Sequence, residues 1–111
     1  MKLSVVIPCY NEEKNVAPLQ QACMDAFGDE IESYELIFVN DGSRDHTWQA
    51  LKALRLKGLC PVKLINLSRN FGKEAAMYAG LQKASGDYVT LLDADLQQSP
   101  DIVLQMVRFL D

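Results

Sequence analysis

Four short runs of apolar and β-branched residues recur along the 111-residue chain. Each run is nearly continuous and lacks the alternation of a strand that has one solvated face. Such runs are typical of strands in the interior of a sheet that is covered on both sides. The pattern therefore predicts four strands buried on both faces, at Leu3–Cys9, Tyr34–Asn40, Val62–Leu67 and Tyr88–Leu92.

Helical patterns lie between and after these runs. We expect helices over about Val16–Phe27, from Asp45 onward, over about Lys73–Ala84, and from Ser99-Pro100 onward. The first three helices should end near glycines, which stand at Gly28, Gly58 and Gly86. The last helix carries an apolar stripe formed by Ile102, Val103, Met106, Val107 and Leu110.

The alternation of strand and helix defines the expected fold class. Repeated strand–helix units give parallel strands that are joined by helical crossovers. We therefore predict one α/β domain over residues 1–111, with an open, mostly parallel sheet and helices on both faces. Ligands bind such sheets beyond the carboxyl ends of the strands, so the residues after each strand are the candidates for a site.

Composition narrows the class of protein. Apolar residues make up 49% of the chain and charged residues 23%, as in soluble globular domains. The formal net charge of −4 argues against a nucleic-acid partner and against attachment to anionic lipid through basic charge. No apolar run approaches the roughly 20 residues of a membrane-spanning helix. Three cysteines without CxxC spacing suit a reducing cytosol, so we expect a cytoplasmic chain.

Polar and aromatic residues follow the first predicted strand. Pro8 ends that strand, Tyr10 offers a ring for stacking, and Asn11 and Glu12 offer polar groups to a ligand. The same residues equally fit the start of a helix, where acidic charge is favourable. Both interpretations stay open for this segment.

The second predicted strand is followed by Asp41 and Gly42. A carboxylate in this place either hydrogen-bonds a ribose or a base edge, or forms a turn that caps the next helix. Asp45 is the better cap candidate, which leaves Asp41 for a ligand. His46, the single histidine, has no partner cluster in the sequence, and we expect it to be structural or solvated.

Arg69 and Lys73 flank Gly72 after the third predicted strand. Two cations before the N-terminus of a helix predict an anion site, although two solvated surface cations fit the same pattern. The spacing is not that of a Walker A loop, and no GxGxxG segment occurs, which argues against a classical dinucleotide site.

Asp93 and Asp95 follow the fourth predicted strand. On extended backbone, residues two apart point to the same side, and two like charges at the end of a buried strand are costly without a partner. A divalent cation resolves this conflict, and Gln97 offers a third oxygen. The alternative is an acidic surface turn.

Taken together, the strand ends offer carboxylates for a cation, carboxylates for a ribose or base, and cations for phosphate. This combination fits a nucleoside diphosphate with Mg²⁺ or Mn²⁺, and a metal-bound diphosphate is a good leaving group. The predicted reaction class is the transfer of the group that the diphosphate carries.

Four segments, in the same order, resemble the inverting family 2 glycosyltransferases with a GT-A fold. They are SVVIPCYNEE at residues 4–13, VNDGS at 39–43, NFGKEAA at 70–76 and DADLQQSP at 93–100. The third and fourth segments are similar to those of the polyprenyl-phosphate sugar transferases, which include dolichyl-phosphate-mannose synthase and the undecaprenyl-phosphate glycosyltransferases. The resemblance covers nearly the whole chain.

The resemblance implies roles for the matching residues. The donor-binding set that we predict comprises Pro8, Tyr10, Asn11, Glu12, Asp41, Arg69, Lys73 and Asp93. Within it, Lys73 and Arg69 would lie toward the sugar or phosphate. Asp93 and Asp95 would be the catalytic carboxylates and, with Gln97, would hold Mg²⁺ or Mn²⁺ against the diphosphate of a UDP- or GDP-linked sugar. In this family a lipid phosphate oxygen attacks the anomeric carbon, with inversion.

Members of the family extend well beyond this length, so the resemblance implies that residues 1–111 are the donor-binding part, without the acceptor half. We expect this part alone to bind nucleotide weakly and to be inactive, and the parent protein to work at the cytoplasmic face of the membrane. The expected partners also include a second copy of the chain, in a homo-oligomer. The alternatives are a family 2 enzyme that acts on a polysaccharide and a non-catalytic nucleotide-sugar-binding module. The segment at residues 70–73 favours the lipid-phosphate branch.

Overall fold

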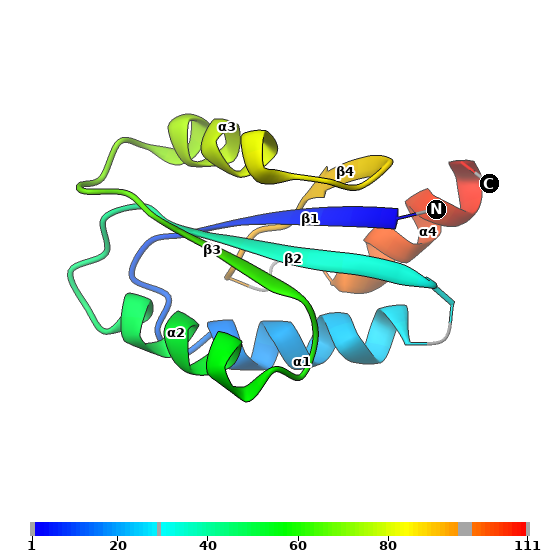
Figure 1. Ribbon diagram of the computed structural model, residues 1–111, viewed down its shortest axis with the longest axis horizontal. Coiled ribbons are helices and arrows are strands. Elements are labelled where there is room, and N and C mark those ends of the chain that lie inside the picture. The colour runs from blue at the N-terminus through cyan, green and yellow to red at the C-terminus, as the bar shows by residue number, and fades with distance from the viewer. Residues whose placement is uncertain (1, 29, 96–98, 111) are drawn as a thin grey trace.

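Strands and helices alternate throughout the part of the computed structural model that is described, residues 2–28, 30–95 and 99–110 (Figure 1). The strands are β1 (Lys2–Cys9), β2 (Ser33–Asn40), β3 (Val62–Asn66) and β4 (Tyr88–Leu91). The helices are α1 (Val16–Phe27), α2 (Thr47–Lys57), α3 (Lys73–Lys83) and α4 (Pro100–Leu110). None of these helices has the length and apolarity that are needed to span a membrane. Each predicted element is present, with ends that differ by no more than two residues.

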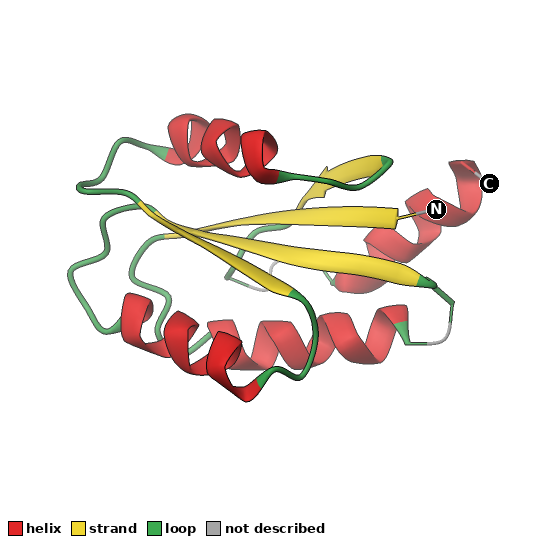
Figure 2. Cartoon of the chain, viewed as in Figure 1, coloured by secondary structure: helices red, strands yellow, loops and turns green. Residues whose placement is uncertain are grey.

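Within the described residues, the strands form one parallel sheet in the order β3-β2-β1-β4 (Figure 2). β1 lies between β2 and β4, and its Val5 pairs with Leu36 on one side and with Thr90 on the other. Helices α1, α2 and α4 pack on one face and α3 on the other (Figure 1). This arrangement confirms the predicted fold class. It also brings the residues that follow β1, β2 and β4 to one edge of the sheet.

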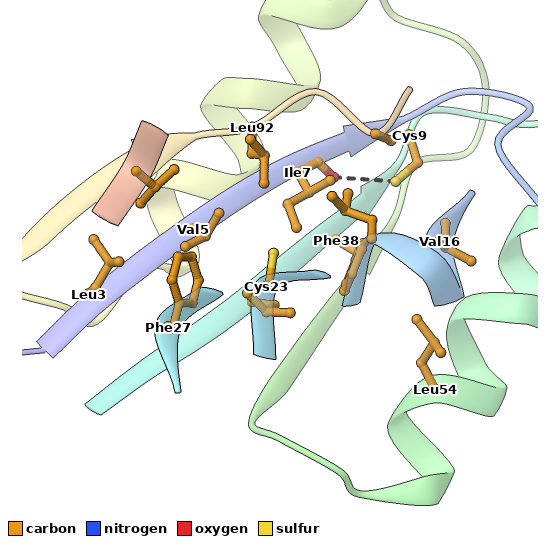
Figure 3. Close-up of a cluster of buried hydrophobic side chains, with 14 of the residues drawn as sticks. Leu3, Val5, Ile7, Cys9, Val16, Cys23, Phe27, Phe38, Leu54 and Leu92 are labelled. Atoms are coloured by element: carbon orange, nitrogen blue, oxygen red, sulfur yellow. Dashed lines mark hydrogen bonds between the residues drawn. The ribbon is translucent and has the colours of Figure 1, made fainter. Parts of the chain in front are cut away.

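The larger core lies between the sheet and α1, α2 and α4. Val5 and Ile7 of β1 face this core, whereas Val6 between them faces α3. Figure 3 shows Cys23 and Phe27 of α1 directed toward this side of β1. All five side chains are fully buried. β1 is therefore the rigid centre of the domain, and the loop that follows it starts from a fixed position.

Helix α3 approaches the other face of the sheet closely at Gly80. A Cβ atom at this position would lie 2.3 Å from Cγ1 of Val6 and 3.2 Å from Cγ2 of Val39. Ala76, one turn earlier in α3, is fully buried against the same face. Because protein interiors are close-packed, the small residue at position 80 sets the distance between α3 and β1.

The prediction that every strand is buried on both faces is wrong for β3 and β4. Val89 and Leu91 are 41% and 39% exposed, and residues 62–65 of β3 are half-buried. These strands are the two edges of the sheet. Val89 and Leu91 pair with Ser4 and Val6, so they share the face on which α3 lies, and α3 packs there on β1, β2 and β3. A continuous apolar run shows that a strand has few polar side chains, but it does not predict whether another element covers both of its faces.

Glycines end two of the three predicted helices. Gly28 and Gly58 are the C-cap residues of α1 and α2. Helix α3 instead has Ala84 as its C-cap, and Gly86 lies in the loop before β4. A Cβ atom at Gly86 would lie 2.7 Å from Oγ of Ser4. The glycine at this position therefore serves the packing of the loop on β1, and the prediction that it ends α3 is corrected.

Helix α4 turns only part of its predicted apolar stripe toward the core. Val103 and Val107 are buried, whereas Ile102 and Met106 are 47% and 51% exposed. The side chain of Leu110 lies outside the described residues. Helix α4 packs on α1, so the residues that face α1 are covered and their neighbours on the β4 side are exposed.

Candidate functional site

A cavity of about 450 Å³ opens where the carboxyl ends of β1, β2 and β4 meet the start of α3. This volume is in the range of small-molecule sites. The lining residues come from the end of β1, from the segments that follow each of the four strands and from the first residue of α3. They are Pro8, Cys9, Tyr10, Glu12, Asp41, Asn70, Gly72, Lys73, Asp93, Ala94 and Asp95. The cavity therefore lies at the edge of the sheet that the fold predicts.

Most of the predicted site residues line this cavity, namely Pro8, Tyr10, Glu12, Asp41, Lys73, Asp93 and Asp95. Asn11 and Arg69 are not among its lining residues, and Gln97 lies outside the described residues. The sequence did not identify four further lining residues, Cys9, Asn70, Gly72 and Ala94. Each lies next to or within three residues of a predicted site residue, and that proximity was the signal that could have identified them.

Lys73 and Asp93 form an ion pair in the lining, with 2.6 Å between Nζ and Oδ1. Lys73 is the first residue of α3, and Asp93 lies two residues after the end of β4. The lysine side chain is 61% exposed and the aspartate side chain 34%. The cavity thus contains paired opposite charges that remain accessible to solvent.

Asp41 holds the loop between β3 and α3. Its Oδ1 accepts a hydrogen bond from the amide of Phe71 at 2.9 Å, and its Oδ2 accepts one from the amide of Gly72 at 3.1 Å. The residue is only 3% exposed. Asp41 therefore fixes the backbone immediately before Lys73, a task that the sequence does not reveal, while it also lines the cavity.

The same loop lies directly against Gly42. A Cβ atom at Gly42 would lie 2.2 Å from the carbonyl carbon of Arg69 and 2.3 Å from the amide nitrogen of Asn70. Gly42 also has a positive φ of 64°, a backbone conformation that residues other than glycine rarely adopt. Both observations show that the segment after β2 admits only glycine next to Asp41.

Asn11 connects two loops and does not line the cavity. It has a φ of 55°, a conformation that asparagine tolerates better than most residues. The backbone amide of Asn11 donates a hydrogen bond to Oγ of Ser43 at 2.9 Å. Its side-chain oxygen Oδ1 accepts one from the backbone amide of Arg44 at 2.9 Å. These bonds fasten the loop after β1 to the loop after β2. Asn11 thus joins the two loops, and the ligand contact predicted for it from the sequence stays a prediction.

Tyr10 and Glu12, the sequence neighbours of Asn11, both line the cavity. The ring of Tyr10 is 42% exposed. The carboxylate of Glu12 accepts a hydrogen bond from Nδ2 of Asn15 at 2.5 Å, and its amide donates to Oγ1 of Thr47 at 2.9 Å. An accessible ring and an oriented carboxylate therefore stand at the carboxyl end of β1.

Arg69 and Lys73, which the sequence treats alike, have different surroundings. The guanidinium of Arg69 lies over the ring of Phe71, with 4.7 Å from Cζ to the ring centroid. Stacking on an aromatic ring is a common arrangement of arginine. Lys73, in contrast, lines the cavity.

Asp45 and His46 lie at the start of α2, away from the cavity lining. Oδ1 of Asp45 accepts from the backbone amide of Thr47 at 2.9 Å, but the N-cap residue of α2 is His46, so the prediction that Asp45 caps the helix is corrected by one position. Partial burial alone would raise the pKa of Asp45, but hydrogen bonds from Thr47 and Glu13 outweigh it and lower the pKa. His46 is 80% exposed, and its Nδ1 lies 3.7 Å from a carboxylate oxygen of Glu13. The solvated interpretation of His46 is the one that the structure supports.

Cys9 lines the cavity as a neutral thiol. Burial raises its pKa, and the nearby carboxylate of Glu12 raises it further. Its Sγ lies 3.4 Å from the carbonyl oxygen of Ile7, as the dashed line in Figure 3 shows. A thiol whose pKa is raised is a poor nucleophile, so the cavity does not present Cys9 as a covalent catalyst.

Asp93 and Asp95, the two carboxylates that the sequence predicts as ligands of a divalent cation, both line the cavity. Among the described residues, no group of three or more His, Cys, Asp or Glu side chains is arranged to hold a metal. Mg²⁺ and similar ions commonly bind through one or two carboxylates and complete their coordination with substrate phosphates and water. Two carboxylates in the lining of an open cavity fit this mode of binding, whereas they do not form a closed structural metal site.

The fold and the cavity define an α/β domain with a charged ligand site at the carboxyl edge of a parallel sheet. The model of the family described as Glycosyl transferase family 2 matches residues 4–111. The chain belongs to this family of glycosyltransferases, and the resemblance that its motifs indicated is confirmed.

Relatives with curated names agree with this membership. Over 97% of its length the chain is 40% identical to the uncharacterized glycosyltransferase YkcC of Bacillus subtilis (strain 168). Over 96% of its length it is 39% identical to an undecaprenyl-phosphate 4-deoxy-4-formamido-L-arabinose transferase of Pseudomonas paraeruginosa. The matched segments make up 33% and 31% of these proteins, so the chain spans about one third of the length of the curated relatives that it matches.

Solved structures confirm the fold. TarS of S. aureus in complex with UDP-GlcNAc has a TM-score of 0.81 at 28% identity, with 100% of this chain and 31% of that chain covered. Glucosyl-3-phosphoglycerate synthase of Mycobacterium tuberculosis, solved with Mn²⁺, UDP and glucosyl-3-phosphoglycerate, has a TM-score of 0.74 at 25% identity, with 98% and 39% covered. Both neighbours extend well beyond the part that matches this chain.

Proposed function

We propose that this chain supplies the donor-binding and metal-binding part of an inverting glycosyltransferase, which moves a sugar from a nucleoside-diphosphate sugar to a polyprenyl phosphate. One observation carries the proposal: Asp93, Asp95 and Lys73 line the same cavity as Tyr10 and Asp41. The first three supply carboxylates for a cation and an ammonium group for phosphate. The last two supply a ring and a carboxylate for a nucleoside.

The nucleoside would bind at the carboxyl ends of β1 and β2. The exposed ring of Tyr10 offers a surface on which a base can stack. Glu12 and Asp41 are acceptors for a ribose hydroxyl or a base N–H group. Asn11 acts indirectly in this proposal, because its hydrogen bonds to the loop after β2 keep Tyr10 and Glu12 in place.

The diphosphate would lie between β4 and the start of α3. Asp93 and Asp95 would hold Mg²⁺ or Mn²⁺ there, and a bound cation neutralises charge on the diphosphate and makes it a better leaving group. The Mn²⁺ in the structure of the mycobacterial neighbour supports the choice of a divalent ion. Lys73, which lines the cavity at the start of α3, would contact a phosphate oxygen from the helix side.

In the reaction, an oxygen of the acceptor phosphate forms a bond to the anomeric carbon of the sugar. The bond between that carbon and the diphosphate oxygen breaks, and the nucleoside diphosphate leaves with the electron pair. Attack from the side opposite to the leaving group inverts the anomeric configuration. A phosphate nucleophile is already anionic, so the reaction makes little demand on a general base.

The polyprenyl-phosphate acceptor is supported by the name of the Pseudomonas relative, which is an undecaprenyl-phosphate transferase. Because the chain spans about one third of its relatives, we assign acceptor binding to the remainder of a protein of their length. A lipid acceptor would place the reaction at the cytoplasmic face of a membrane. Residues 1–111 alone would bind the donor without transferring the sugar.

The proposal is tested by titrating the chain with UDP and with GDP in a calorimeter, with and without Mn²⁺. We expect one of the two nucleotides to bind, with higher affinity when Mn²⁺ is present. Asp95→Asn should abolish the effect of Mn²⁺ because it removes a carboxylate of the cation site. The matched control is Asp25→Asn on α1, which lies outside the cavity lining and should behave like the wild type.

Failure of the folded chain to bind either nucleotide, at any concentration of Mn²⁺, would contradict a donor site. If nucleotide binds but Asp95→Asn and Asp25→Asn respond equally to Mn²⁺, the nucleotide site stands and the assignment of the cation to Asp95 is wrong.

A further inference from the structure

The ion pair between Lys73 and Asp93 crosses the cavity from α3 to the segment after β4. Both residues are held from outside the pair. The backbone before Lys73 is clamped by the two oxygens of Asp41, and Asp93 follows directly after the buried residue Leu92. The clamped loop and the segment after the buried Leu92 therefore bring the two charges together, and rotation of the side chains is enough to open the pair.

The pair is also easy to open. Both side chains are accessible, at 61% and 34% exposure, and ion pairs of this kind contribute little to stability. Lysine carries its charge on a flexible stem with several rotatable bonds, so its ammonium group can turn to another partner without a change in the backbone. Opening the Lys73–Asp93 pair is thus a matter of side-chain rotation.

Oδ1 of Asp93 is in contact with the ammonium group at 2.6 Å, and it is one of the two oxygens that this carboxylate offers to a divalent cation. A cation on Asp93 and an ammonium group at the same oxygen repel each other, so the two cannot occupy it together. A diphosphate offers the ammonium group a new anionic partner in the same cavity. Arrival of the diphosphate would therefore release Asp93 to the cation.

We propose that Lys73 is an exchange residue: it neutralises Asp93 in the absence of ligand and turns to the diphosphate when the donor binds, so that the cation and the diphosphate bind cooperatively. This inference rests on the proposed function, because it concerns the same donor and cation. Lys73 is then more than a phosphate contact, since it also weakens the binding of the cation alone. Premature loading of the metal without a donor is thereby disfavoured.

The inference is tested by measuring Mn²⁺ binding to the full chain by electron paramagnetic resonance of the free ion, first alone and then with saturating UDP or GDP. In Lys73→Met the competing charge is lost, and we expect Mn²⁺ alone to bind about two- to fivefold more tightly than in the wild type. The nucleotide should bind more weakly, and the factor by which it improves Mn²⁺ affinity should fall.

Two variants control for charge and for helix stability. Lys83→Met removes a lysine at the other end of the same helix, outside the cavity lining, and should leave Mn²⁺ affinity unchanged. Lys73→Arg keeps the charge and should stay close to the wild type. A merely structural role for Lys73 predicts weaker Mn²⁺ binding in Lys73→Met, which is opposite in sign to the expected result.

If Lys73→Met leaves Mn²⁺ affinity unchanged or lowers it, the exchange role is wrong, even where nucleotide binding to the wild type upholds the proposed function. If Asp93→Asn leaves Mn²⁺ affinity intact, the cation does not bind Asp93 and the inference also fails. Absence of both nucleotide and Mn²⁺ binding in the wild-type chain overturns the proposed function, and the inference with it.

Discussion

Ser4 on β1 donates its hydroxyl hydrogen to Oε2 of Glu35 on β2, at 2.7 Å, between two strands at the centre of the sheet. Glu35 is only 3% exposed, yet it is fully partnered. The amide of Ser85 donates to the same oxygen at 2.8 Å, and Nζ of Lys63 lies 2.9 Å from the other oxygen. A buried carboxylate thus ties β1, β2, β3 and the loop before β4 together at the edge opposite to the cavity.

This carboxylate predicts a dependence of stability on pH. Burial alone would raise the pKa of Glu35, but hydrogen bonds from Ser4, Ser85 and Lys63 outweigh burial and lower the pKa to about 2, from an ordinary value of 4.5. Because the folded-state pKa is the lower one, the contribution is complete above about pH 4.5 and is lost as the pH falls toward 2. Its size is about 3 kcal/mol.

Urea unfolding between pH 7 and pH 2 measures this contribution. In Glu35→Gln the wild-type loss of stability below pH 4.5 should shrink by about 3 kcal/mol, and the variant should be less stable at pH 7. Glu32→Gln, an exposed glutamate just before β2, should keep the wild-type profile. Parallel profiles for the wild type and Glu35→Gln would show that Glu35 is not the responsible group.

Asp41→Asn should loosen the loop that carries Lys73. In asparagine an NH2 group replaces one of the two carboxylate oxygens, so a donor would face the amide of Phe71 or of Gly72 and that hydrogen bond would be lost. Loss of one buried acceptor costs about 1–3 kcal/mol. Hydrogen exchange checks this directly, since the amide of Phe71 or of Gly72 should exchange faster.

The matched control for this clamp is Asp87→Asn. Asp87 accepts a hydrogen bond from the amide of Lys2 at the opposite edge of the sheet. The exchange rates of Phe71 and Gly72 should remain those of the wild type in this variant. Unchanged rates in Asp41→Asn itself would mean that the loop is held by other contacts.

Gly80→Ala should destabilise the domain, although alanine favours helix by about 1 kcal/mol. The added methyl group would lie 2.3 Å from Cγ1 of Val6, and such overpacking typically costs about 1–3 kcal/mol. In a Val6→Ala background the 2.3 Å conflict is removed and only the 3.2 Å approach to Cγ2 of Val39 remains, so Gly80→Ala should cost clearly less than in the wild type. A double-mutant cycle followed by thermal unfolding measures this difference, and additive effects would refute the close contact.

Much of the fold was predictable from residues next to one another in sequence. The run around Val5 is apolar because β1 lies at the centre of the sheet, and the order of strands and helices then determines the class of fold. The exposure of Val89 and Leu91 was not predictable. An edge strand can be as apolar as a central one, and only the tertiary arrangement decides what covers it.

The candidate site was predictable where position after a strand decides the outcome, as for Asp41 and Asp93. It was not predictable where a local backbone angle decides it. The positive φ of Asn11 turns this residue to the next loop, while its neighbour Glu12 lines the cavity. The pairing of Lys73 with Asp93 joins segments that are distant in sequence, so no local pattern could indicate it.

The order β3-β2-β1-β4 makes the chain turn back on itself after β3. From β1 to β3, each new strand is added on the same side of the one before it. Helix α3 then returns the chain across β2 and β1, so that β4 pairs with the free side of β1. Crossovers of the same hand that run in opposite directions place their helices on opposite faces, which explains why α3 faces away from α1 and α2 (Figure 1). The cavity lies at this reversal. If all strands were added in a single direction, the same lining residues would be spread along the edge of the sheet. The handedness of the crossovers therefore brings these residues together in one cavity.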